Sequence, residues 1–314
     1  MSIAVIKPGV QSTIQSGPRT GMRHLGVPAG GAADPLSLAL ANRLVGNAWN
    51  APALELTLVG PTLRFETTTS FALAGGTVKP LLNREAVGDH ETLLANAGDE
   101  LTIGPIGHGA RAYLAVPGGF SSNKMLGSAS TNLQAGFGGL QGRALQSGDS
   151  LVMNGAEIPI LKTPREFRPV MQRGWALRTC LGAESSLLDD AALARLFETN
   201  WTVARRADRM GLRLDGAQLV VASDGRMPSA GVFPGTVQCP EDGAPYILSV
   251  DAGTVGGYPR VAQVARADRH LLGQLKPGDH VRLLYREPDD AVAELRAKID
   301  YWRDWLPDSA EIIG

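Results

Sequence analysis

The chain has 314 residues, with 30 basic and 31 acidic side chains and a formal net charge of −1. At 44% hydrophobic it can bury a core, while 38 glycines and 20 prolines disfavour a helical bundle, since each glycine inside a helix costs about 1 kcal/mol. The balanced charge argues against a nucleic-acid or membrane-surface binder, and no apolar run approaches the roughly 18 residues of a membrane span. We expect a mainly β protein with a few helices.

Strand-like segments rich in Val, Leu, Thr and Tyr recur along the chain between Gly, Pro or Asp residues. Segment 53–66 contains Gly60-Pro61, which we expect to be the turn between two strands. A Gly-Asp turn that leads into an alternating strand occurs three times and predicts barrel-like modules built from similar hairpins. The turns begin segments 98–103, 148–153 and 278–283; the other strands are expected at 112–116, 175–181, 201–204, 246–250 and 281–285.

Four helices are signalled. The first, 36–45, has Asp34 as N-cap, Pro35 in its first turn and Gly46 at its end. Two more are expected at 189–197 and 268–275. The last, 289–305, carries an apolar stripe that is expected to pack on the body of the protein: Val292, Leu295, Ile299 and Trp302.

Segment 155–174 has three prolines and weak periodicity, and we interpret it as the crossover between two modules. The expected division is a first β module at 1–160 and a second at 161–314 that includes the C-terminal helix.

Signatures of self-contained chemistry are missing. There is no phosphate loop, no nucleophile elbow, no biotin-acceptor sequence and no metal-ligand spacing, and His90 starts an H-E-x-x-H pattern that lacks its second histidine. Cys180 and Cys239 form no C-x-x-C pair, and the N-terminus does not resemble a signal peptide. We therefore expect a cytoplasmic protein without its own metal.

Glycine-dense loops carry the candidate site residues instead. The first, 11–34, holds Gln15, Gly30, Gly31 and Asp34 before a helix N-terminus, where backbone N–H groups can bind an anion or a carbonyl oxygen. The alternative is that Asp34 only caps the helix. The second, 116–131, presents candidates that bind a polar ligand or form plain turns: Gly118, Gly119 and Ser121.

The densest loops are 207–213, 229–240 and 251–259. Arg209 can grip a carboxylate or phosphate through two hydrogen bonds, and Gln238 suits an amide or ureido group. Asp251 is a candidate base or a partner that orients Arg209; the alternative is a structural ion pair in a barrel corner. The same loops contribute five further candidates for substrate binding: Gly235, Thr236, Thr254, Gly257 and Tyr258.

These segments resemble the allophanate-hydrolase-subunit-2 family, also called biotin-dependent-carboxyltransferase-like. The resemblance covers nearly the whole chain and rests on motifs in the family's order: GVPAGGAADP, AYLAVPGGF, LGSAST, ADRMGLRL, SAGVFPGTVQCP, DAGTVGGYPRVAQV and PGDHVRLL. It implies two cyclophilin-like β-barrel modules, of the carboxyltransferase subdomain A and subdomain B types.

The resemblance also implies an activity and partners. A smaller subunit-1-type (Kip-inhibitor-like) protein and a LamB/YcsF-type protein are expected, and together the three open 5-oxo-L-proline to L-glutamate with ATP. In that reaction Arg209 stabilises charge, Gln15 and Gln238 hold the amide, and Asp251 or Asp34 orients it. ATP with magnesium is expected at a shared or partner site, and no biotin is attached to this chain.

Two alternatives stay open. One is a carboxyltransferase component that acts on urea-like substrates with carboxybiotin from another chain, and the other is a non-enzymatic, Kip-antagonist-type regulator. The chain also departs from the family pattern, since Ser16 stands where an Asp is usual, Ala33 where Met is common and Ala207 where Ser is usual. If that Asp takes part in catalysis, this chain acts on another substrate or relies more on its partner.

Overall fold

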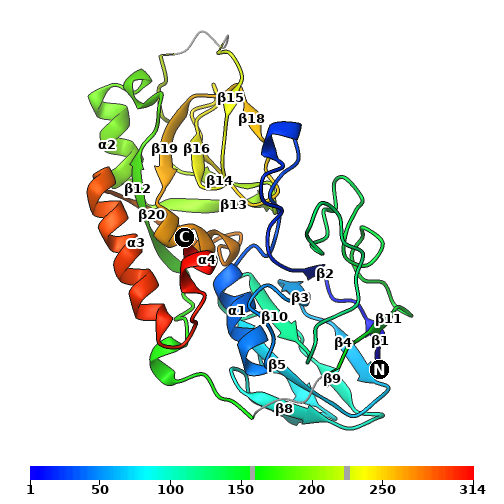
Figure 1. Ribbon diagram of the computed structural model, residues 1–314. Helices are drawn as coiled ribbons and strands as arrows, with labels where there is room; N and C mark the ends of the chain where they lie inside the picture. Colours follow the sequence, from blue (N-terminus) through cyan, green and yellow to red (C-terminus); the bar gives the residue numbers. More distant parts are fainter. Residues whose placement is uncertain (156–159, 223–226) are drawn as a thin grey trace. The chain divides into compact units, whose positions relative to one another are not determined.

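The computed structural model describes residues 1–155, 160–222 and 227–314 (Figure 1). Its contacts divide the chain into two compact units. Unit 1 contains Met1–Arg19, Gly30–Met171 and Asp304–Asp308, and unit 2 contains Thr20–Ala29, Gln172–Arg303 and Ser309–Gly314. The proposed module boundary after residue 160 stays a prediction, and part of the expected crossover, 156–159, lies outside the described residues.

Unit 1 contains two antiparallel sheets. Phe65 and Phe71, one from each sheet, have ring centroids 5.3 Å apart, and the apolar side chains of both sheets form one buried cluster. The first sheet has the order β11 (Ser150–Val152), β1 (Ser2–Lys7), β4 (Thr62–Phe65), β9 (Glu100–Thr102), β6 (Leu81–Leu82), β7 (Glu85–Ala86). The second has the order β2 (Gln11–Gln15), β3 (Ala53–Thr57), β10 (Arg111–Ala115), β5 (Thr69–Gly75), β8 (Thr92–Ala95).

Helix α1, Pro35–Leu44, packs on β5 and β10 of the second sheet. The Asp34 carboxylate accepts from the Ser37 N–H at the N-terminus, and Gly46 has a φ of 72° just beyond the C-terminus. The predicted helix and both of its end signals are therefore confirmed.

Unit 2 contains a closed seven-stranded barrel. Strands β12 and β20 pair in parallel, and the other neighbours are antiparallel. The order is β12 (Gly174–Leu181), β19 (Arg260–Val264), β16 (Thr236–Gln238), β17 (Tyr246–Leu248), β14 (Gly211–Asp215), β13 (Trp201–Ala207), β20 (His280–Tyr285). A separate two-stranded sheet joins β15 (Ala230–Gly231) and β18 (Val255–Gly256). The expected mainly β fold with a few helices is confirmed.

The helices of unit 2 differ in part from expectation. Segment 268–275 is not an α-helix, because Arg266–Gly273 forms the 3-10 helix η4. In α3, Pro288–Arg303, the expected stripe buries Trp302, whereas Val292 is 45% exposed. The remaining helices are α2 (Asp190–Glu198), α4 (Ser309–Ile313) and the short 3-10 turns η1 (Arg23–Leu25), η2 (Arg165–Phe167, in unit 1) and η3 (Ser185–Leu187). Among the described residues, no helix is long and apolar enough to cross a membrane.

Segment 53–66 was expected to form a hairpin, and this is wrong. Its two strands, β3 and β4, lie in different sheets. Leu58 has a φ of 62°, and the Gly60 N–H donates to the Gly104 carbonyl rather than to its own segment. Gly60-Pro61 therefore passes the chain from one sheet to the other.

The three Gly-Asp turns share one geometry. In each, the glycine has a φ between 84° and 94°, and the Asp carboxylate accepts from the backbone N–H three residues earlier. One residue of a neighbouring strand accepts from the glycine N–H and donates to the Asp carbonyl. That residue is Phe65 for Gly98-Asp99, Val5 for Gly148-Asp149 and Val203 for Gly278-Asp279.

Candidate functional site

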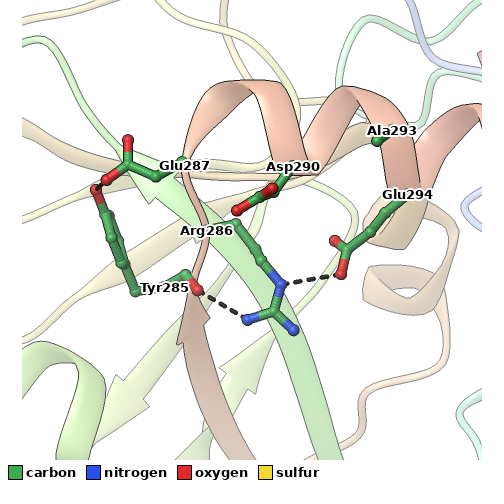
Figure 2. A pocket seen from close by; sticks show the side chains of 6 residues that line it. All are labelled: Tyr285, Arg286, Glu287, Asp290, Ala293 and Glu294. Carbon is green, nitrogen blue, oxygen red and sulfur yellow. Dashed lines mark hydrogen bonds and ion pairs between the residues drawn. The ribbon is translucent and has the colours of Figure 1, made fainter.

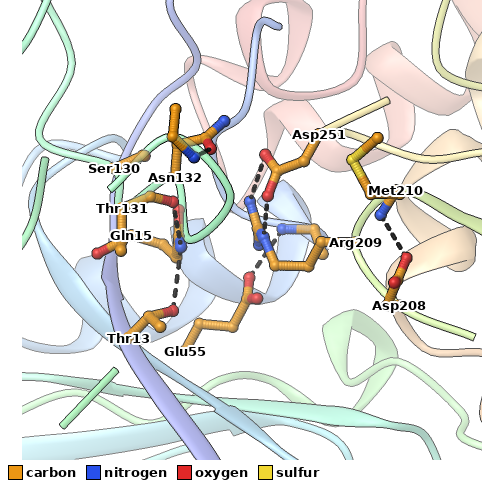
Figure 3. Close-up of polar contacts among 12 residues, drawn as sticks. Thr13, Gln15, Glu55, Ser130, Thr131, Asn132, Asp208, Arg209, Met210 and Asp251 are labelled. Carbon is orange, nitrogen blue, oxygen red and sulfur yellow. Dashed lines mark hydrogen bonds and ion pairs between the residues drawn. The ribbon is translucent and has the colours of Figure 1, made fainter. Parts of the chain in front are cut away.

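Arg209 and Asp251 form a buried ion pair in unit 2 (Figure 3). Arg209 lies in the turn between β13 and β14, which the Asp208 carboxylate closes by accepting from the Met210 N–H at 2.7 Å. The guanidinium donates from Nε to Asp251 Oδ2 at 2.6 Å and from Nη2 to Oδ1 at 3.2 Å. Both residues are 5% exposed, so the pair is shielded from water.

The backbone reinforces this pair. The Asp251 N–H donates to the Arg209 carbonyl at 2.8 Å, and the Ser249 N–H donates to the Met210 carbonyl at 3.0 Å. The two loops therefore hold the guanidinium in one orientation. Of the two roles considered for Asp251, orienting Arg209 fits this geometry, and a fixed, buried guanidinium is suited to stabilise developing negative charge.

Gln238, on β16, is buried, and its Nε2 donates to the Tyr258 carbonyl at 3.2 Å. Gly256 passes so close that a Cβ at this position would lie 2.6 Å from Gln238 Nε2, which requires glycine there. The side chain of Tyr258 itself is 53% exposed. The structure thus brings Gln238 and the 254–258 loop together, and their predicted substrate contacts stay predictions.

The other candidates of this loop face serve its packing. Thr236 Oγ1 donates to Gln263 Oε1 at 2.8 Å and accepts from the Phe233 N–H at 3.1 Å. The Thr254 carbonyl accepts from Val232, Gly235 adopts a φ of 88° in the turn before β16, and Gly257 is exposed.

In unit 1, Gln15 lies at the end of β2 and is fully buried. Its Nε2 donates to Thr13 Oγ1 at 3.0 Å and to the Thr131 carbonyl at 3.1 Å, contacts that Figure 3 shows. Because a carbonyl can only accept, these contacts fix which end of the amide is nitrogen. Gln15 Oε1 then finds no donor among the described residues. A ligand N–H is the kind of group that would complete it.

Ser16, the residue that departs from the family pattern, is part of a cluster of hydroxyls. Its Oγ lies 3.2 Å from both Ser128 Oγ and Ser130 Oγ, and its N–H donates to Ser130 Oγ at 2.8 Å. Arg19 is buried beside them, with Nε donating to the Met125 carbonyl at 3.1 Å. The small hydroxyls of segment 126–131 therefore join two loops of unit 1.

Asp34 is a helix cap. Its Oδ1 accepts from the Ser37 N–H at 3.1 Å and its Oδ2 from the Ser37 hydroxyl at 2.5 Å. Gly30 and Gly31 precede it and are buried, with Gly31 packed against Pro18. The capping alternative for Asp34 is what the geometry contains.

A buried polar network beneath this loop was missed by the sequence analysis. Glu55 Oε2 accepts from the Tyr113 hydroxyl and from the Ala33 N–H, both at 2.8 Å, and the Tyr113 oxygen accepts from the Asp34 N–H at 2.8 Å. Arg111 pairs with Glu55 at 3.3 Å. Burial raises the pKa of Tyr113 well above its usual value, and the Glu55 and Asp34 charges add to this effect. Arg and Tyr at alternating positions of a strand were the available signal.

The second glycine loop is packed against its own unit. The Gly118 N–H donates to Asn47 Oδ1 at 2.8 Å, and a Cβ at Gly119 would lie 2.9 Å from the Pro52 carbonyl oxygen. Ser121 is exposed, and its N–H donates to the Val152 carbonyl at 2.8 Å.

Neither cysteine is poised to act as a nucleophile. Burial raises the pKa of Cys180, and the Glu287 and Glu294 charges raise it further. Burial and the Asp242 charge raise the pKa of Cys239 to about 11. Both are therefore neutral thiols near pH 7. No group of three or more His, Cys, Asp or Glu residues suited to a metal ion occurs in 1–155, 160–222 and 227–314.

Figure 2 shows a surface pocket of 370 Å³ between the end of β20 and the start of α3. Arg286 spans it, donating from Nε to Glu294 Oε1 at 3.0 Å and from Nη1 to the Tyr285 carbonyl at 2.8 Å. None of its lining residues is a predicted site residue.

Comparison with known families identifies the chain. The model of the carboxyltransferase domain, subdomain A and B, matches residues 25–284, which include Arg209, Gln238 and Asp251. The chain belongs to this family.

Curated relatives fall into two groups. The chain is 39% identical to a 5-oxoprolinase subunit of Escherichia coli over 96% of each chain, and 34% identical to the 5-oxoprolinase subunit of the same name from Haemophilus influenzae over 94% of each. It is 33% identical to the urea amidolyase of Lachancea kluyveri, over 89% of this chain but only 17% of that protein.

Solved structures of carboxyltransferase-family proteins agree with the fold. The urea amidolyase of K. lactis superposes with a TM-score of 0.89 at 31% identity over 96% of this chain, which spans about a fifth (20%) of that protein. The protein TTHA0988 superposes with a TM-score of 0.81 at 34% identity, over 90% of this chain and 55% of that one.

Proposed function

We propose that this chain is one subunit of a heteromeric, ATP-dependent 5-oxoprolinase that opens 5-oxo-L-proline to L-glutamate. The observation that carries the proposal is the 39% identity to a 5-oxoprolinase subunit across 96% of both chains. That protein is named as a subunit, which supports a heteromeric enzyme. The proposed partners are the subunit-1-type (Kip-inhibitor-like) protein and the LamB/YcsF-type protein.

The reaction needs an external source of energy and several kinds of group. One ATP and two waters would be consumed for each lactam, giving glutamate, ADP and phosphate: one water hydrolyses ATP overall, and the other opens the C–N bond. ATP supplies the phosphoryl group that activates the lactam oxygen. The described residues provide no cluster of magnesium ligands, so the proposal places ATP and magnesium at a shared or partner site.

Within this chain, the proposal gives Arg209 the task of stabilising negative charge that develops on the substrate. Its guanidinium is already oriented by Asp251, so little reorganisation is needed as charge appears. In this scheme Asp251 is a positioning residue, because both of its oxygens accept from Arg209. Gln238, buried on β16 with its amide held at Tyr258, is the proposed amide-recognition residue.

A second candidate function is a carboxyltransferase acting on a urea-like substrate. It is favoured by the TM-score of 0.89 to the K. lactis urea amidolyase. That reaction would require carboxybiotin from another chain. The relatives of this group are several-fold longer than the matched region, whereas the 5-oxoprolinase subunits match over nearly their whole length.

The two functions are separated by a substrate comparison. The chain is co-expressed with its proposed partners, and the purified complex is given 5-oxo-L-proline and ATP, or urea and a carboxylated biotin carrier. Glutamate release in the first reaction alone supports the proposal. Carboxylation of urea in the second alone supports the alternative. A stable complex that turns over neither substrate would support a regulatory, Kip-antagonist-type protein.

A further inference from the structure

Three arginines of unit 2 lie together without a carboxylate partner among the described residues. Arg266 and Arg269 are three residues apart on η4, and side chains at i and i+3 of a 3-10 helix project from the same face. Arg23 begins η1, and the Arg23 and Arg266 charges both act on Arg269. We call this group the Arg23–Arg266–Arg269 cluster.

The cluster is anchored by neutral groups. Arg23 Nη2 donates to the Val232 carbonyl, and the Arg23 guanidinium carbon lies 5.1 Å from the centre of the Phe233 ring. A carbonyl and an aromatic face hold a guanidinium in place but leave its positive charge uncompensated. The anchoring therefore orients the charge of Arg23 without cancelling it.

Two donors in the cluster are unsatisfied. Arg23 Nη1 and Arg269 Nε are buried and find no acceptor among the described residues. Other partly buried arginines of the same unit are compensated: Arg178 pairs with Asp268, and Arg260 pairs with Glu184. Orphaned buried donors are costly, so their presence in a cationic group indicates an absent acceptor.

Electrostatics points the same way. Burial, together with the Arg266 and Arg23 charges, lowers the pKa of Arg269 to about 10. The guanidinium is still protonated near pH 7, so three positive charges repel one another there. Arg266 is exposed and Arg269 is partly exposed, which opens the cluster to solvent.

We propose that the Arg23–Arg266–Arg269 cluster binds a phosphate-bearing anion. A carboxylate offers two oxygens and one charge, whereas a phosphate offers at least three oxygens and up to two charges, which matches several guanidinium groups better. Inorganic phosphate and the phosphate chain of a nucleotide share this chemistry. The inference rests on the charges and unsatisfied donors of unit 2 and does not depend on the proposed 5-oxoprolinase activity.

Calorimetric titration of the full chain tests the site. Inorganic phosphate, and separately ATP without magnesium, are titrated at an ionic strength held constant with chloride. We expect saturable phosphate binding that the double substitution Arg266→Gln/Arg269→Gln weakens at least about tenfold, because two charged donors are removed. Arg296→Gln is the matched control, since it removes one charge from an exposed position on α3 of the same unit.

A second readout separates a binding role from a structural one. Without phosphate, Arg266→Gln is expected to raise the melting temperature slightly, because it relieves repulsion at an exposed position, and phosphate should then stabilise this variant less than the parent chain. ATP binding that is tighter than and competitive with phosphate identifies a nucleotide site, and equal or weaker ATP binding identifies a free-phosphate site. The proposal is overturned if the parent chain shows no saturable phosphate binding. It is also overturned if the double variant binds phosphate as tightly as Arg296→Gln does.

Discussion

The guanidinium of Arg209 is held against the carboxylate of Asp251 by two contacts, Nε to Oδ2 at 2.6 Å and Nη2 to Oδ1 at 3.2 Å. The two loops are joined at the same point, because the Asp251 N–H donates to the Arg209 carbonyl. The orientation of Arg209 is thus determined by both side chain and backbone, and a change in either partner should be felt by any reaction that uses this charge.

The first prediction concerns Arg209→Lys. Lysine keeps the charge but cannot make both contacts to Asp251, so the positive charge moves away from its fixed position. We expect the kcat of the assembled enzyme to fall by about 10²–10³, the effect of losing one preorganised transition-state donor. Steady-state kinetics with 5-oxo-L-proline measures it.

The control for Arg209→Lys is Arg213→Lys. Arg213 pairs with Asp242 at 2.6 Å in the same unit, but the two side chains are 40% and 48% exposed. Activity should be unchanged in this variant, since exposed pairs contribute little. Equal losses in the two variants would remove the special role given to Arg209.

The second prediction ranks the three Gly-Asp turns. Asp279 is fully buried and accepts from the Trp175 indole N–H at 2.9 Å, whereas Asp99 caps an exposed turn. Asp279→Ala leaves the indole N–H buried without its acceptor and should cost about 1–3 kcal/mol of unfolding free energy. Asp99→Ala should be the least damaging. Urea unfolding of the two variants gives the order, and a reversed order would contradict the account of the shared turn.

The third prediction concerns alkaline pH. Cys239 has a folded-state pKa of about 11, above its unfolded value near 9, so its protonated form is favoured by folding. Its contribution is complete below pH 9 and is lost as pH rises from 9 to 11, with an upper limit of about 2–3 kcal/mol. Cys239→Ala should lose less stability than the parent chain over this window. Identical slopes in urea unfolding would show that Cys239 does not titrate as described.

The fourth prediction concerns acid. Burial lowers the pKa of His270 well below its usual value; the Lys298 and Arg178 charges contribute, and Asp268 opposes them. The unfolded chain binds a proton at His270 below about pH 6.5 while the folded chain does not, so stability falls as pH drops below 6.5. His270→Gln should flatten the stability profile between pH 6.5 and 5. An unflattened profile, with His90 still present in both proteins, would assign the acid sensitivity elsewhere.

Local features of the fold were predictable because local rules determine them. Asp34 before Pro35 specified the start of α1, and the glycines of the three Gly-Asp turns have the positive φ that glycine tolerates best. Segment 53–66 shows the limit. Gly60-Pro61 marks a break in the chain, but whether the next strand pairs with the last or crosses to another sheet depends on non-local hydrogen bonds such as that from Gly60 to Gly104.

The candidate site was predictable to a similar extent. Residue type and loop composition nominated Arg209 and Asp251, and the structure brings the two into contact. Glu55 and Tyr113 were not nominated, because each lies in an ordinary strand pattern and their contact spans 58 positions of the chain. The arginine cluster escaped notice for the same reason, since Arg23 and Arg269 become neighbours only in the folded unit.

The most direct test of the central claim is glutamate formation from isotopically labelled 5-oxo-L-proline by the complex of this chain with its two proposed partners. We predict that glutamate and ADP appear in equal amounts, only with ATP present, and that omitting this chain abolishes the product. A folded, complete complex that forms no labelled glutamate, or that forms it equally well without this chain, would contradict the account.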